Sequence, residues 1–303
     1  MTAIEFILAG MLAAATPFLL AALGDLVAER SGVLNLGVEG MMALGAAVGF
    51  MTVYSGGGHV LGFVFGGLSG VAIALVFAFV TLGLHANQVA TGLAIGILGL
   101  GLSAYFGKPF ESFTVTGVGK IAIPGLVDLP VVGGLFRQDI VVWLSLLFTP
   151  ALWYFLKHTK LGLLLRAVGE NPRAASAIGY PVTLIRLGSV AFGGLMAGIA
   201  GAYASTIYTP LWADGMIAGR GWIAVALVVF GTWMVGRVFL GACLFGAVSL
   251  GGIAAQTVGL AIPSQLLASM PYIVTIVVLG IISSNRRLLK INGIASLGEP
   301  FEK

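Results

Sequence analysis

Apolar runs of about 20 residues recur along the whole chain, separated by short polar or glycine-containing stretches. A helix of that length crosses a hydrocarbon core of roughly 30 Å. The pattern predicts an all-α, polytopic membrane bundle that forms a single transmembrane domain over residues 1–303. We expect about nine transmembrane helices, at residues 4–24, 32–53, 60–84, 88–106, 139–156, 184–207, 221–236, 238–257 and 267–284.

Positive charge is unevenly shared between the two sides of this predicted bundle. If the 157–183 connection and the tail after residue 284 are cytoplasmic, 11 of the 15 Lys and Arg residues lie inside and 4 lie outside. This asymmetry satisfies the positive-inside rule, which orients polytopic proteins. We therefore expect the N-terminus to face outward and the C-terminus to face the cytoplasm.

The composition agrees with a membrane protein and argues against several other classes. Hydrophobic residues make up 59% of the chain and charged residues 9%, with a mean hydropathy of +1.08, whereas soluble domains carry about 25% charged residues. The net charge of +4 therefore does not indicate a nucleic-acid partner. The sequence contains no G-x-x-x-x-G-K-[ST] phosphate loop and no Cys/His cluster with metal-ligand spacing. We expect no catalytic residue, no metal and no cofactor on this chain.

Two polar residues interrupt the second apolar run, "SGVLNLGVEGMMALGAAVGFM" at residues 31–51. On a helix, Asn35 and Glu39 would share one face. A carboxylate at this depth is costly unless it is paired or hydrated, so the pair should face the bundle interior. Two interpretations stay open. The pair could line a solute path, or Glu39 could brace a helix broken at the nearby glycines by accepting backbone N–H groups or by pairing with Arg30.

A second polar cluster, Asn87, Gln88 and Thr91, starts the fourth predicted helix. Asn87 is expected to cap that helix, and Thr91 could bond back to a backbone carbonyl. Gln88 has no such local role and is the better candidate for the solute path or a subunit contact.

The 157–183 connection contains a predicted short helix in "ENPRAASAIG". Asn171 suits the N-cap, Pro172 suits the first helical position, and Gly179 suits the stop. A short helix held between two spans suits docking into a groove of a cytosolic partner. The alternative is a cytoplasmic linker whose positive charges serve topology alone.

Four stretches together resemble one family of membrane proteins. "LRAVGENPRAASAIGY" resembles the coupling segment of ABC importer permeases that carry simple sugars, nucleosides and branched-chain amino acids. "SGVLNLGVEGMM" resembles the second-span motif of the nucleoside-type branch. "ANQVATGLAIGILGLGL" and "GRGWIAVALVVFG" also match, in the family's order and spacing.

The resemblance implies an inner-membrane permease subunit of a bacterial ATP-driven importer that works by alternating access. Nucleosides are the first expected substrate, with simple sugars or branched-chain amino acids as the alternative. The implied partners are a second permease subunit, usually a different chain, a cytosolic ATPase that binds ATP and Mg²⁺, and an extracytoplasmic solute-binding protein. The coupling segment would bring Arg166, Glu170, Asn171 and Arg173 to the ATPase.

The outer connection "TPLWADGMIAGRGW" contains the candidate contacts for the binding protein, Trp212, Asp214 and Arg220. Charged groups on such a face can steer a docking partner; the alternative is an ordinary solvated loop. A proton-coupled secondary transporter that uses Glu39 is the rival class, although Glu39 is the one acid predicted to be buried and no second buried acid is predicted in a partner span.

Overall fold

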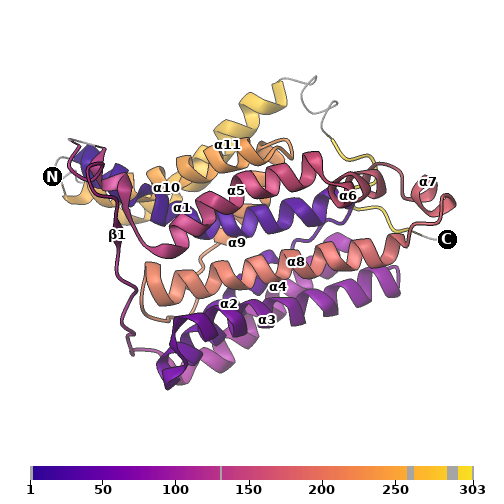
Figure 1. The fold of residues 1–303 in the computed structure, drawn as a ribbon. Coiled ribbons are helices and arrows are strands. Elements are labelled where there is room, and N and C mark those ends of the chain that lie inside the picture. Colours follow the sequence, from indigo (N-terminus) through magenta and orange to yellow (C-terminus); the bar gives the residue numbers. More distant parts are fainter. Residues whose placement is uncertain (1–2, 130–131, 258–262, 285–292, 302–303) are drawn as a thin grey trace.

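The computed structural model describes residues 3–129, 132–257, 263–284 and 293–301 and is mostly helical (Figure 1). The α-helices are α1 (Ala3–Arg30), α2 (Val38–Thr52), α3 (Gly58–Ala78), α4 (Gln88–Gly107), α5 (Ile140–His158), α6 (Lys160–Glu170), α7 (Pro172–Ala177), α8 (Val182–Tyr203), α9 (Arg220–Phe230), α10 (Val235–Thr257) and α11 (Ser264–Ser284). Strands β1 (Ile121–Ala122) and β2 (Arg137–Gln138) form a two-stranded antiparallel sheet. Short π-helical turns extend α2, α3 and α8, namely η1 (Val53–Gly57), η2 (Phe79–Gly83) and η5 (Ala204–Tyr208). Short 3₁₀ turns are η3 (Lys108–Phe110) and η4 (Gly133–Phe136).

Six helical stretches among the described residues are long and apolar enough to cross a bilayer. One of them, Val38–Gly83, is 46 residues long, about twice what a bilayer needs. It reverses at Gly56 and Gly58, whose φ angles are +86° and +72°, a conformation that glycine adopts without steric cost. Helices α2 and α3 therefore run back side by side, as two spans were predicted to do (Figure 1).

The predicted bounds at the N-terminal side require two corrections. Helix α1 continues past residue 24 to Arg30. This continuation includes Asp25 and Glu29, whose side chains are buried in the bundle. Residues 31–37 are not helical, and α2 begins at Val38. Asn35 and Glu39 thus do not share a helix face, and the prediction of a break at the nearby glycines is confirmed.

The predicted span 221–236 is also corrected. Helix α9 is 11 residues long, about 16 Å at 1.5 Å per residue, which is too short to cross a bilayer alone. It ends at Phe230, and a turn at 231–234 follows, with positive φ angles of +49° at Thr232 and +54° at Trp233. Helix α10 then begins at Val235.

Glycines allow the central helices to approach closely. An added Cβ on Gly198 of α8 would collide with the Gly66 carbonyl of α3, and one on Gly45 of α2 would collide with the Gly198 backbone. Small residues at such positions are how helices associate in lipid. The α2–α3–α8 packing therefore depends on backbone contact.

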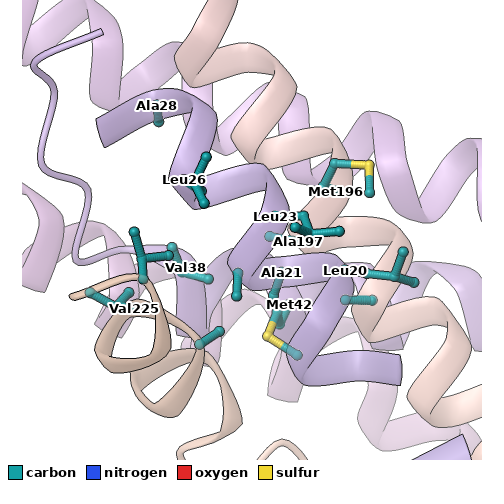
Figure 2. Packing of buried hydrophobic residues seen from close by; sticks show 14 of the residues in the cluster. Leu20, Ala21, Leu23, Leu26, Ala28, Val38, Met42, Met196, Ala197 and Val225 are labelled. Atoms are coloured by element: carbon teal, nitrogen blue, oxygen red, sulfur yellow. The ribbon is translucent and has the colours of Figure 1, made fainter. Parts of the chain in front are cut away.

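The apolar core surrounds the second half of α1 (Figure 2). Leu20, Leu23 and Leu26 of α1 are buried and face Met196 and Ala197 of α8 and Met42 of α2. Helices α8, α9 and α10 also pack on α1, which makes α1 the central helix of the bundle.

The bundle has two distinct ends (Figure 1). At one end lie the start of α1 and the β1–β2 hairpin, where Gln138 donates to the Ala9 carbonyl. At the other end lie α6, α7 and the C-terminal segment 293–301. This arrangement agrees with an odd number of crossings.

Candidate functional site

Glu39 joins α2 to the beginning of α9. Its side chain is 3% exposed. Its Oε1 accepts a hydrogen bond of 2.7 Å from the Gly219 N–H, and its Oε2 accepts one of 2.6 Å from the Gly221 N–H. A carboxylate at a helix N-terminus satisfies N–H groups that have no partner in the helix and complements the helix dipole. This geometry is that of a brace. Arg30 donates instead to the Trp233 carbonyl, 2.7 Å away.

Glycine at 221 is required by this contact. A Cβ at Gly221 would meet the Glu39 backbone itself. Arg220, the first residue of α9, lies near enough to Glu39 for an electrostatic attraction. Its guanidinium also sits 5.5 Å from the Tyr208 ring centre. The start of α9 is thus fixed by the Glu39 carboxylate, by the close approach of Gly221 to the Glu39 backbone and by the contact of Arg220 with Tyr208.

The non-helical segment 31–37 is held by buried polar side chains. Asn35 accepts from the Gly37 N–H at 2.9 Å and so closes a turn just before α2. Gln88, 2% exposed, accepts from the Leu34 N–H at 2.8 Å. Irregular backbone at membrane depth needs such internal partners, and Asn35 and Gln88 supply them.

The C-terminal segment completes this network. Arg186 of α8 is 1% exposed and donates to the Ser31 carbonyl at 3.1 Å, the Glu299 carbonyl at 3.2 Å and the Ser296 hydroxyl at 3.1 Å. Ser296 in turn donates to the Gly169 carbonyl of α6 at 2.6 Å. The segment 31–37, α6 and the chain's end are therefore tied together.

The start of α4 follows the sequence prediction in part. Asn87 caps the helix by accepting from the Ala90 N–H at 3.0 Å, as predicted. Thr91 is half-buried one turn further on. Gln88 binds the backbone of Leu34, the residue next to Asn35. A role of Asn35, Gln88 and Thr91 in a solute path stays a prediction.

The short helix in the 157–183 connection forms as its sequence predicts. Asn171 caps α7 by accepting from the Ala174 N–H at 3.0 Å, Pro172 is its first residue, and Gly179 has a φ of +94° just beyond its end. Ala175 turns inward and packs with Val168 and Val182. The outer side is exposed.

The four predicted coupling residues do not lie on one surface. Glu170, Asn171 and Arg173 are exposed around the start of α7. Arg166 is half-buried on α6, where its Nε donates to the Gly162 carbonyl at 3.4 Å. Ile178, which the sequence reasoning did not single out, is 73% exposed beside them.

The loop before α9 separates its three candidates. Asp214 is exposed. Trp212 is 1% exposed and packs with Ala47 and Phe50, so its ring offers no surface to a partner. Arg220 faces inward toward Glu39 and Tyr208. Of the three, Asp214 is therefore the one available for docking.

Two buried carboxyl groups on α1 were missed because the predicted span ended before them. Asp25 is 1% exposed and Glu29 0%. The Trp233 indole N–H donates to Glu29 Oε2. Within the described part of the chain, both Asp25 oxygens and Glu29 Oε1 have no hydrogen-bond partner. The i, i+4 spacing of "DLVAE" on a continuing helical pattern was the available signal.

The fold defines a polytopic helical membrane protein with a short exposed helix between two spans. Residues 7–283 match the family described as branched-chain amino acid transport system / permease component, and the chain belongs to this family. It is an ABC transporter permease of the sugar and nucleoside type.

Three curated relatives cover most of the chain. A provisionally assigned glucose ABC transporter permease protein of Haloferax volcanii is 42% identical over 88% of each chain. A guanosine ABC transporter permease protein of Bacillus subtilis is 34% identical over 91% of each. A nucleoside ABC transporter permease protein of Lactococcus lactis is 31% identical over 96% of each.

Proposed function

We propose that this chain is a nucleoside-importing permease subunit that works by alternating access. The observation that carries the choice is that two relatives, named for nucleosides and for guanosine, align along more than nine-tenths of the chain. The second candidate substrate is glucose or a similar sugar, which the Haloferax volcanii relative favours at 42% identity. Both substrates are neutral and rich in hydroxyl groups, so an uncharged path serves either.

The proposed path follows the segment 31–37 and the starts of α4 and α9. Asn35, Gln88 and Thr91 lie along or near this segment, and Glu39 fixes α9 against it. Glu39 and Gln88 act in this proposal mainly as braces of the path. Their side chains already use their acceptor atoms on backbone N–H groups.

The proposed energy source is a separate cytosolic ATPase that hydrolyses ATP with Mg²⁺ and docks on α7. Support comes from the exposed residues Glu170, Asn171 and Arg173 together with exposed Ile178, a mixture of charge and apolar surface that suits a partner. Because Arg186 and Ser296 tie α6 to the segment 31–37, movement of α7 has a direct route to the path. A solute-binding protein at the opposite end and a second permease chain complete the proposal.

Competitive uptake distinguishes the two substrates. Two strains are compared, one with the whole transporter and one from which only this gene is deleted. Both are given labelled guanosine, uridine or glucose, each with and without excess unlabelled competitors. We expect guanosine and uridine uptake to disappear with the gene and glucose uptake to be unchanged. Loss of glucose uptake alone would replace the nucleoside proposal by the sugar proposal.

A further inference from the structure

A basic cavity lies at the end of the bundle that carries α6. It has a volume of about 500 Å³, and its lining includes Arg30, Lys157, Arg166 and Arg237. Arg30 ends α1, Lys157 is the next-to-last residue of α5, and Arg237 is in the first turn of α10. Since three apolar spans end together here, the cavity lies at the level where hydrocarbon gives way to lipid headgroups.

In the described part of the chain no carboxylate forms a salt bridge with the four basic side chains, and Glu170 lies near enough to Arg30 only for an electrostatic attraction. The salt bridge found among the described residues joins Lys108 to Glu111 and involves none of these four side chains. Arg30 and Arg166 donate to backbone carbonyls. Arg237 donates to the Thr232 hydroxyl at 2.6 Å. The Lys157 ammonium lies 5.2 Å from the Trp153 ring centre. Each cation therefore keeps capacity for an anion.

An apolar cavity continues from the basic one along the membrane face. It has a volume of about 300 Å³ between α5 and α10, and Leu146, Pro150 and Phe239 line it. Trp153, Val235 and Gly236 line both cavities. A cationic cavity that opens into an apolar groove matches a ligand with an anionic head and a hydrocarbon tail.

We propose that these adjoining cavities bind one anionic phospholipid, its phosphate among the four basic side chains and an acyl chain in the groove between α5 and α10. Basic pockets between spans at the membrane surface are the usual setting for anionic lipid headgroups. Trp153, which lines both cavities, is a residue type that favours the membrane interface. The site rests on the membrane fold and is independent of which solute the permease carries.

The site has a structural consequence for coupling. Arg166 lies on α6, the helix that leads into α7. Arg30 is the last residue of α1 and directly precedes the segment 31–37. A phosphate shared by these two arginines would join α6 to α1 across the cavity. The lipid would then hold the base of the proposed coupling unit against the central helix.

Native mass spectrometry of the full-length protein, purified from membranes in mild detergent, tests this proposal. The probes are phosphatidylglycerol, phosphatidylcholine of the same acyl chains, and soluble glycerophosphate. One variant, Lys157→Gln with Arg237→Gln, removes two exposed charges from the cavity. The matched control, Lys120→Gln with Arg137→Gln, removes one Lys and one Arg at the opposite end, both exposed.

A third variant leaves the charge unchanged. A Cβ at Gly236 meets open space, so Gly236→Leu should fold and fill the junction of the two cavities. We expect one retained phosphatidylglycerol per chain, with occupancy falling at least about tenfold, or ~1.4 kcal/mol, in the cavity double variant and in Gly236→Leu. The control double variant should match the unaltered chain.

Four results would overturn the proposal. Equal retention of phosphatidylcholine would show that the site does not distinguish an anionic headgroup from a zwitterionic one. An equal loss in the control double variant would indicate general surface electrostatics. Displacement of the lipid by equimolar glycerophosphate, or unchanged lipid binding in Gly236→Leu, would show a phosphate site without an acyl-chain groove.

Discussion

At the scale of single residues, Glu39 fixes the position of a helix through both of its carboxylate oxygens. Its two oxygens each accept one backbone hydrogen bond, from Gly219 and Gly221, at the start of a helix too short to span the membrane alone. A charged acceptor gives stronger hydrogen bonds than a neutral one. The position of α9 therefore depends on this side chain.

We predict that Glu39→Gln weakens the brace. Glutamine offers one acceptor oxygen and places an N–H₂ group against the second backbone N–H, leaving a buried donor unsatisfied at a cost of about 1–3 kcal/mol. Thermal unfolding in detergent should show a lower Tm. Maximal uptake should fall with it, while the substrate concentration for half-maximal uptake stays unchanged.

The control is Glu111→Gln, which alters an exposed pair with Lys108 and should leave Tm unchanged. A large rise in the half-saturating concentration of Glu39→Gln at unchanged Tm would place Glu39 on the solute path instead.

Local residue roles could be predicted from the sequence, and contacts between distant residues could not. The caps Asn87 and Asn171 were predictable because a capping side chain bonds to its own helix. The interior position of Glu39 followed from the cost of exposing a carboxylate to lipid. Its partners at Gly219 and Gly221 lie 180 and 182 residues away, and no local pattern encodes such a pairing.

At the scale of elements, α7 is a helix of six residues held by its cap and by Ala175 on its inner side. So short a helix has little stability of its own. Its anchoring to α6 and α8 presents the outer residues at a fixed position, as docking requires.

We predict that Arg173→Glu lowers co-purification of the ATPase with this chain by about tenfold, as a loss of ~1.4 kcal/mol would, because reversing a charge at an interface sets like charges against each other. Pull-down from membranes measures it. Arg137→Glu, an exposed reversal at the opposite end, is the control. Unchanged ATPase recovery in Arg173→Glu would remove Arg173 from the docking surface.

Most elements were predictable because apolar runs and turn residues mark them independently of context. The errors occur where polar groups are buried. Asp25 and Glu29 extend α1 beyond its apolar run, and the segment 31–37 is non-helical because Gln88 satisfies its backbone from another helix. Hydropathy alone cannot detect either arrangement, because two carboxyl groups lower the hydropathy at the end of α1 and the partner of the segment 31–37 lies on another helix.

At the scale of the whole molecule, the two ends of the bundle differ in character. One carries the start of α1 and the β1–β2 hairpin, and the other carries α6, α7 and the segment 293–301 (Figure 1). The uneven distribution of Lys and Arg predicts that the second end is cytoplasmic.

The topology can be tested with cysteines, because Cys243 is the single cysteine of the chain. In a Cys243→Ser background, Lys120→Cys should react with a membrane-impermeant thiol reagent in intact cells. Ala177→Cys should react only after the cells are permeabilised. Both positions are exposed, so burial does not confuse the result. The reverse pattern would invert the proposed orientation.

The proposed function depends above all on ATP hydrolysis by a partner chain, which would drive uptake. The most direct test measures labelled guanosine uptake in cells with the whole transporter, after a protonophore has removed the proton gradient while ATP is maintained, and after deletion of the ATPase gene. We expect uptake that survives the protonophore and is lost with the ATPase. Uptake that survives ATPase deletion and collapses with the proton gradient would contradict it, and would turn attention to the buried carboxyl groups of Glu39, Asp25 and Glu29.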